Sequence, residues 1–117
     1  MGRKNKEITI DDLKADILLA ILKKTNPPIG NKHIACDKFY QNGIPPRLQG
    51  KAKKALNELI KEKFILSKPS KKGYNKCSLN YKKIHDMLNL PKIIETVKRD
   101  PVRKKLLEEK YNHDFQF

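Results

Sequence analysis

The stretch IPPRLQGKAKKALNELIKEKFIL, residues 44–66, indicates how the rest of the chain is organised. Proline suits the first turn of a helix because its missing N–H would have no partner there, so we predict a helix from Pro46 to Lys63. Its apolar residues recur at helical spacing and form one face: Leu48, Ala52, Ala55, Leu56, Leu59 and Ile60. The opposite face consists of Arg47, Gly50, Lys54, Asn57 and Lys61, flanked by Lys51 and Lys53. This helix is predicted to pack on a core and to present a basic face.

A β-hairpin with a basic tip is predicted directly after this helix. Residues 64–68 and 74–80 have the composition of two strands, and the turn Pro69-Ser70-Lys71-Lys72-Gly73 joins them. Earlier in the chain, residues 10–24 are predicted to form a helix, with Thr9 as its N-cap and Asp12 as capping-box partner.

The region between these helices is predicted to hold a short extended piece and a second helix. Ile29-Gly30 is the extended piece, and Asn31 is well suited to cap a helix over residues 32–41. Asn42-Gly43 would end that helix, because glycine readily adopts a left-handed conformation.

Further short helices are expected after the hairpin, over 82–89, from Pro91, and from Pro101 with Asp100 as its N-cap, while residues 111–117 are expected to fray. The apolar side chains of this region are Ile84, Met87, Leu88, Ile93, Ile94, Val97, Leu106 and Leu107. They require burial either on the first helix of the same chain or in a two-fold homodimer through the C-terminal helices. The dimer is the favoured alternative.

The positive charge of the chain is concentrated in its middle. The net charge is +14, and residues 31–66 (eight basic, three acidic) and 67–90 (six basic, one acidic) together contribute +10 of it. Such clustering indicates a polyanionic partner, with nucleic acid first. Lysine accounts for 23 of the 27 basic residues, which fits the codon bias of an AT-rich genome. The placement of the charge is therefore more informative than its amount.

The order of the predicted elements over residues 10–80 resembles the winged helix-turn-helix family, as found in prokaryotic, in particular archaeal, transcription regulators. The resemblance rests on Ile29-Gly30 as the small first strand and on residues 31–41 as the second helix. It also rests on Ile44-Pro45-Pro46-Arg47 leading into the third helix, and on residues 56–65 leading into the hairpin. The predicted fold class is mainly α with a small β-hairpin wing and a C-terminal helical extension. The expected divisions are a basic N-terminal arm (1–8), the winged helix-turn-helix domain (9–81) and the extension (82–117). The longer, proline-rich turn departs from the tight turn of the family.

The resemblance implies that double-stranded DNA is the partner and that the protein regulates transcription in the cytoplasm, on the nucleoid. The third helix would enter the major groove through Arg47, Gln49, Gly50, Lys51, Lys53, Lys54, Asn57 and Lys61. The wing would contact the backbone or the minor groove through Lys68, Lys71, Lys72, Tyr74 and Lys76. Backbone contacts from the second helix would come from Lys32 and His33. The wing lysines also suit the protection of an exposed strand edge, although contact with DNA is the favoured interpretation.

Other functions receive less support from the sequence. Two alternatives stay open, namely an RNA- or ribosome-associated winged helix and an adaptor that binds an acidic protein. The basic segment Arg3-Lys4-Asn5-Lys6 is interpreted either as an arm that reaches DNA or as a solvated terminus. Neither an enzyme motif nor a cofactor motif is found, and no cofactor is expected. His33, Cys36, Cys77 and His85 lack the spacing of a zinc site, and the two cysteines are predicted to be reduced core residues.

Overall fold

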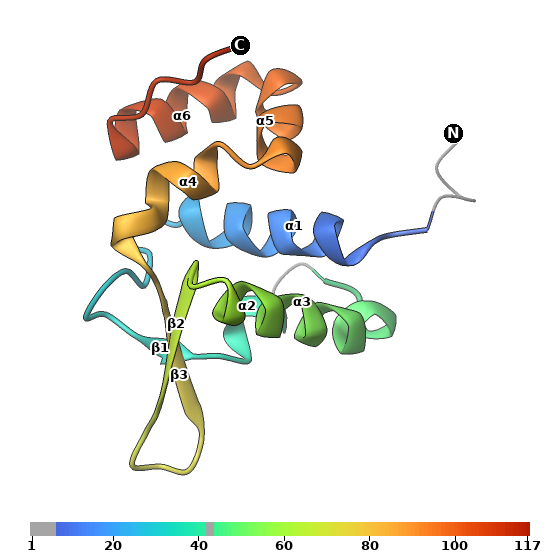
Figure 1. The fold of residues 1–117 in the computed structure, drawn as a ribbon, viewed down its shortest axis with the longest axis vertical. Helices are drawn as coiled ribbons and strands as arrows, with labels where there is room; N and C mark the ends of the chain where they lie inside the picture. Colours follow the sequence, from blue (N-terminus) through green and yellow to red (C-terminus); the bar gives the residue numbers. More distant parts are fainter. Residues whose placement is uncertain (1–6, 42–43) are drawn as a thin grey trace.

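The computed structural model, which describes residues 7–41 and 44–117, consists of helices and a small three-stranded antiparallel sheet at one end of the molecule (Figure 1). The predicted mainly α fold with a β-hairpin is confirmed at this level (Figure 1). The elements follow in the order α1 (Ile10–Leu22), β1 (Ile34–Ala35), α2 (Lys38–Gln41), the 3₁₀ turn η2 (Pro46–Leu48), α3 (Gln49–Lys61), β2 (Ile65–Pro69), β3 (Asn75–Leu79), the 3₁₀ turn η3 (Tyr81–Lys83), α4 (Ile84–Leu88), α5 (Pro91–Lys98) and α6 (Pro101–Tyr111).

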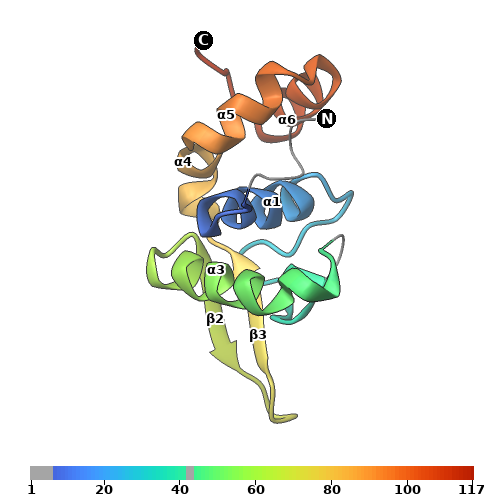
Figure 2. The same ribbon diagram turned by 90° about the vertical axis from the view of Figure 1, so that its right-hand side faces the viewer.

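Helix α1 lies at the centre of the molecule. Thr9 caps it through the predicted capping box, in which Asp12 N–H donates to Thr9 Oγ1 and Thr9 N–H donates to the Asp12 carboxylate. Its buried residues face two partners: α3 packs on one side and α5 on another (Figure 2). Leu13, Ile17 and Ile21 are almost completely buried because α1 is covered in this way.

The sheet has the strand order β1-β3-β2, so that β3 lies in the middle. Strand β3 pairs along its whole length with β2, from Ile65 opposite Leu79 to Pro69 opposite Asn75. The two strands continue as a hairpin that projects from the helices (Figure 1). Gly73 in its turn adopts a φ of 86°, a conformation that favours glycine, as the predicted turn requires.

The predicted second helix over residues 32–41 is wrong in its first half. Ile34 and Ala35 form β1, paired with Cys77 and Lys76 of β3, and only Lys38–Gln41 is helical. Lys32 and His33 consequently precede a strand instead of beginning a helix. Pairing with β3 overrides the local helical pattern, and β-branched Ile34 suits a strand. The predicted stop at Asn42-Gly43 lies outside the described residues.

The predicted extended piece Ile29-Gly30 is correct in part. Ile29 forms an isolated parallel bridge with Leu79, and the N–H of Gly30 donates to the carbonyl of Leu79. The first strand of the sheet nevertheless begins five residues later, at Ile34. The buried hydroxyl of Ser78 donates to the carbonyl of Gly30, which further holds this segment against β3.

A disulfide bond joins Cys36, next to β1, to Cys77 in β3. The prediction of two reduced thiols is therefore wrong. The register of β1 on β3 brings the two residues to a Cα–Cα distance of 4.8 Å, within the range that a disulfide spans. Sequence spacing did not indicate this proximity, because 41 residues separate the two cysteines.

The C-terminal region packs on α1 of the same chain. Most of its apolar side chains are buried there: Ile84, Met87, Leu88, Ile93, Val97 and Leu107. Lys92 forms a 3.1 Å ion pair with Asp12, and the hydroxyl of Tyr111 donates to the carbonyl of Leu22 at the end of α1. Most of the apolar side chains for which the sequence favoured a dimer interface are thus buried within one chain.

The last residues of the chain are ordered against the helices, and the predicted fraying is wrong. His113 and Phe115 are buried, with exposed fractions of 8% and 6%. Asn112 adopts a left-handed conformation that turns the chain back after α6, and the N–H of His113 donates to the carbonyl of Glu108. Among the described residues, no helix combines the length and the hydropathy needed to cross a membrane.

Candidate nucleic-acid interface

Helix α3 has its apolar residues on one face and its basic and amide residues on another, as the sequence predicts. Ala52, Ala55, Leu56 and Leu59 are buried against the core. The side turned away from the core exposes Arg47, Gly50, Lys53, Lys54, Asn57 and Lys61. A side chain added at Gly50 would meet no atom within 4 Å, so the space beside its backbone is open. The helix begins as the 3₁₀ turn η2 at Pro46 and becomes α-helical at Gln49.

A hollow of about 280 Å³ lies between α3 and the hairpin. Lys53 and Asn57 of α3 form one wall, and Tyr74 and Asn75 of the hairpin form the opposite wall. The remaining side is lined by Cys36 and Asp37, just before α2, and by Tyr40 of α2. The lining is completed by Leu56 and Ile60 of α3 and by Ser67 of β2. We call this group of residues the α3–hairpin hollow. It brings together predicted site residues from two elements that the sequence could only treat separately.

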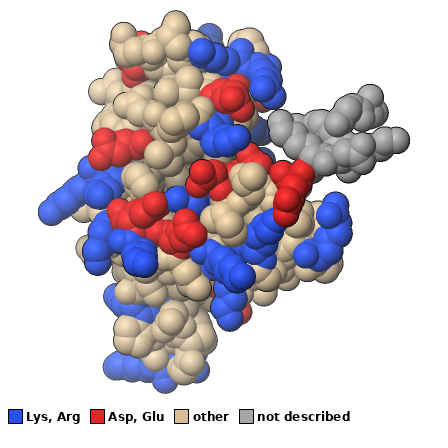
Figure 3. All heavy atoms as spheres, turned by 45° about the vertical axis from the view of Figure 1, so that its right-hand side comes forward, with Lys and Arg blue, Asp and Glu red and all other residues tan. Residues whose placement is uncertain are grey.

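The hairpin itself carries a row of cations. Lys68, Lys71, Lys72 and Tyr74 are exposed, and Lys76 is half-buried. Lys68 and Lys76 are direct cross-strand partners in the pairing of β2 with β3. Like charges in such positions destabilise a hairpin unless an anion lies near them. Figure 3 shows blue basic side chains on this projecting part of the molecule, where all the basic residues are lysines.

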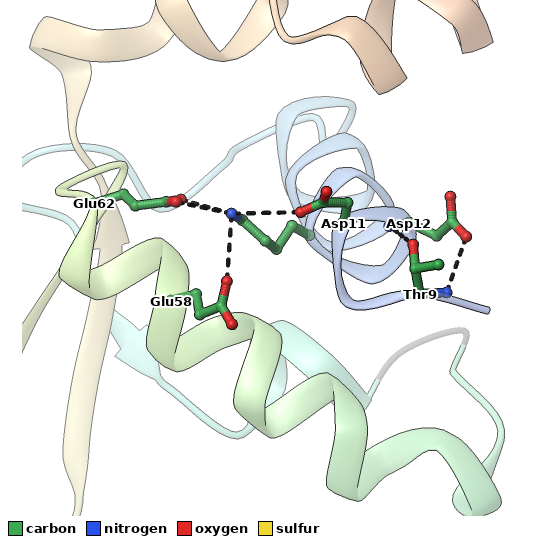
Figure 4. A network of polar contacts seen from close by, with 6 residues as sticks. Thr9, Asp11, Asp12, Glu58 and Glu62 are labelled. Carbon is green, nitrogen blue, oxygen red and sulfur yellow. Dashed lines mark hydrogen bonds and ion pairs between the residues drawn. The ribbon is translucent and has the colours of Figure 1, made fainter. Parts of the chain in front are cut away.

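The acidic residues of α3 lie on its other flank, where Lys14 of α1 binds them. Lys14 Nζ is 2.8 Å from a carboxylate oxygen of Glu62 and 3.7 Å from one of Glu58 (Figure 4). Asp11 completes the group at 3.9 Å. Burial lowers the pKa of Lys14, but the hydrogen bond and charge of Glu62, with the charges of Asp11 and Glu58, outweigh burial and raise it above its ordinary value. The carboxylates are thereby held away from the α3–hairpin hollow.

Two of the residues predicted to enter the major groove, Gln49 and Lys51, are engaged within the chain. Lys51 Nζ donates to the carbonyl of Ile8 at 2.9 Å and lies 3.5 Å from the Glu7 carboxylate. The side-chain amide of Gln49 donates to the carbonyl of Ile44 at 3.3 Å. Both side chains would have to leave these partners to reach a ligand. Arg47, Lys54 and Asn57 are therefore better placed for contact.

The predicted backbone contacts Lys32 and His33 lie apart from the second helix. Lys32 is exposed, and its Nζ donates to the carbonyl of Asn26, while His33 is half-buried. Neither residue lines the α3–hairpin hollow. The N-terminal basic segment Arg3-Lys4-Asn5-Lys6 lies outside the described residues.

Some lining residues of the hollow were missed by the sequence interpretation. Asp37, Tyr40 and Asn75 carry no local signal, because only the packing of α2 and the hairpin against α3 places them there. Burial, and then the charge of Asp37, raise the pKa of Tyr40, so the phenol stays neutral at ordinary pH. Asp37 is the acidic residue of this lining, and we expect it to oppose an anionic ligand.

The residues considered as zinc ligands are not gathered into one group. Cys36 and Cys77 are bonded to each other, and His85 stacks on His113 at the other end of the chain. Among the described residues, no group of three or more His, Cys, Asp and Glu side chains has the geometry for a metal ion.

No protein-family model matches the chain, and comparisons with curated proteins and with solved structures give no significant match. The functional argument therefore rests on the residues and their arrangement.

Proposed function

We propose that this protein is a winged-helix protein that binds double-stranded DNA and acts as a transcription regulator. In this proposal α3 is the recognition helix and the β2–β3 hairpin is the wing. The observation that carries the proposal is the separation of charge on α3. Lys53, Lys54 and Asn57 face outward or toward the hairpin, while Lys14 holds Glu58 and Glu62 on the other flank.

The order of elements supports the winged-helix part of the proposal. Helices α1, α2 and α3 are followed by the β2–β3 hairpin, and β1 pairs with the second strand of that hairpin. This is the order on which the resemblance rested, with the first strand moved from residues 29–30 to 34–35.

The shape of α3 supports contact with the major groove, which is wide enough to admit one helix. The exposed Arg47 and Asn57 have the hydrogen-bonding groups for guanine and adenine edges, respectively. Lys53, Lys54 and Lys61 provide charge for phosphates, and the wing lysines extend that charge beyond the helix. The cross-strand pair Lys68–Lys76 would be neutralised by a phosphate backbone.

The test begins with selection of bound duplexes from a random pool at near-physiological salt, followed by titration of the selected duplex. We expect Lys54→Glu to weaken binding at least about tenfold, because a phosphate attraction becomes a repulsion. Lys98→Glu on α5 is the matched control, since it is exposed, removes the same charge and lies on the C-terminal helices. It should change the affinity less than about twofold.

Base contacts are tested with the same selection. Replacing Arg47 or Asn57 by Ala should relax the sequence preference at one position, at a cost of about 1–3 kcal/mol for the preferred duplex. Equal losses for Lys54→Glu and Lys98→Glu would show that only the total charge matters, and would contradict the proposed interface. Tighter binding to structured RNA than to any duplex DNA would overturn DNA as the partner.

A further inference from the structure

The outer face of α6 is apolar at its centre and charged along one flank. The inner face is covered by the rest of the chain through Leu107 and Tyr111. On the outer face Val102 is 79% exposed and Leu106 is 44% exposed. Phe117 at the end of the extension is also exposed, but its ring is covered by Lys98 and Lys104. Val102 and Leu106, with Lys105, Glu109 and Lys110, line one open depression. We call these five residues the α6 face.

We propose that the α6 face is a dimer interface that binds a second copy of this chain, with the two α6 helices antiparallel about a two-fold axis near Leu106. The proposal is independent of the ligand of α3. It narrows the dimer expected from the sequence to one helix, because most other apolar side chains of the extension are buried within the chain.

The charges of the α6 face are complementary to themselves. Lys105 and Glu109 lie one turn apart on the same flank of the helix. In an antiparallel pair related by a two-fold axis, the same flank of the two helices faces each other with opposite chain directions. Lys105 of each chain therefore lies opposite Glu109 of the other. Neither residue forms an ion pair within residues 7–41 and 44–117, although neighbouring Lys104 and Glu108 pair at 3.1 Å. Both charges are therefore available to a second copy.

The apolar centre fits the same arrangement. An axis near Leu106 places the two Leu106 side chains against each other and brings Val102 against the aliphatic stem of Lys110 from the other copy. In a parallel two-fold pair each flank would face the opposite flank of the other copy, so Lys105 would not lie opposite Glu109. The charge pattern thus selects the antiparallel orientation.

The position of α6 also favours pairing of two highly charged chains. Residues 91–117 contain seven basic and five acidic residues, so their net charge is +2 of the total of +14. Two copies therefore meet where their repulsion is weak. Helix α6 and the hairpin lie at opposite ends of the molecule, so pairing leaves the hairpin uncovered (Figure 1).

The first experiment measures the mass of the full chain by sedimentation at increasing concentration. A single helix face is smaller than the roughly 1,200–2,000 Å² of stable complexes, so we expect half-dimerisation on the order of 100 µM. Leu106→Glu should leave the protein monomeric at about five times that concentration, because it would bury two carboxylates together. Tyr81→Glu is the matched control, since Tyr81 is another exposed large side chain, on η3, and should dimerise as the parent does.

The second experiment exchanges the charges. Lys105→Glu and Glu109→Lys should each be monomeric alone, because each places like charges opposite one another. A mixture of the two variants should form a heterodimer, since all four charges then meet opposite ones. Circular dichroism of each variant confirms that it is folded. A parent chain that stays monomeric, a dimeric Leu106→Glu variant, or a mixture that fails to associate would each overturn the proposal, whatever the DNA binding of the chain.

Discussion

At the scale of single residues, the pair His85 and His113 gives the C-terminal segment a dependence on pH. The Nδ1 atoms of the two rings are 2.7 Å apart, so one must carry a proton and the other must accept it. Burial, and then the charge of His85, lower the pKa of His113, while Asp114 and Glu108 act in the opposite direction. The Nε2 atom of His113 is buried without a partner among the described residues.

The lowered pKa of His113 predicts a loss of stability in mild acid. Below about pH 6.5, His113 binds a proton in the unfolded chain, whereas in the folded chain it binds one only at lower pH. The free energy of unfolding is therefore highest above about pH 6.5 and decreases as the pH falls toward the pKa of His113 in the folded chain. We expect thermal unfolding temperatures to decrease between about pH 7.5 and about pH 5. His113→Leu should remove most of this decrease, and His33→Gln should not. An unchanged pH dependence in His113→Leu would contradict the assignment.

Residue-scale features differ in how far the sequence could predict them. The capping box of Thr9 and Asp12 and the cap of Asp100, which accepts from the N–H of Arg103, were predictable because each lies within one helical turn. The contact between Lys14 and Glu62 was not, because it links residues 48 positions apart.

At the scale of elements, the bond between Cys36 and Cys77 ties the β1 segment to the middle strand. The bond closes a loop across 41 positions of the chain. Closing a loop of this length reduces the number of conformations that the unfolded chain can adopt. We expect reduction by a phosphine to lower the free energy of unfolding by about 2–4 kcal/mol, as measured by urea denaturation with and without reductant. A Cys36→Ala, Cys77→Ala variant should be equally destabilised and insensitive to the reductant. Identical midpoints for the oxidised and reduced parent chain would contradict this prediction.

The second helix shows why element boundaries were harder to predict than element types. Residues 32–37 contain no residue type that excludes a helix, so the pattern predicts a helix that begins directly after the cap Asn31. The hydrogen bonds of β1 to β3, and the Cys36 N–H donating to the Asn75 carbonyl, hold this segment extended. Those partners lie about forty positions along the chain, beyond the reach of local propensity.

For the whole molecule, the concentration of charge predicts that the proposed binding to DNA depends strongly on salt. Each neutralised phosphate releases counterions, and the exposed cations of α3 and the hairpin allow several contacts. We expect the slope of log K against log salt to be about −5 to −7. Replacing Lys71 and Lys72 by Ala should make it less negative by about 2, as measured by titration at several salt concentrations.

The matched control for the salt experiment removes two cations from the C-terminal helices. Lys98 and Arg99 are exposed on and beside α5, and their replacement by Ala lowers the net charge by the same amount. The slope should then stay within about 0.5 of the parent value, because distant charges are screened. Equal changes in the two variants would contradict a localised interface.

The types and order of most elements, the separation of apolar from basic residues on α3, and the basic hairpin all follow from local sequence patterns. These depend on periodicity, caps and turns, which act over a few residues. Packing between distant segments is what brings Cys36 to Cys77, starts β1 at Ile34 and folds the C-terminal segment back on the helices. Each of these depends on contacts between residues far apart in the chain, whose energy exceeds the local preferences of the segments involved.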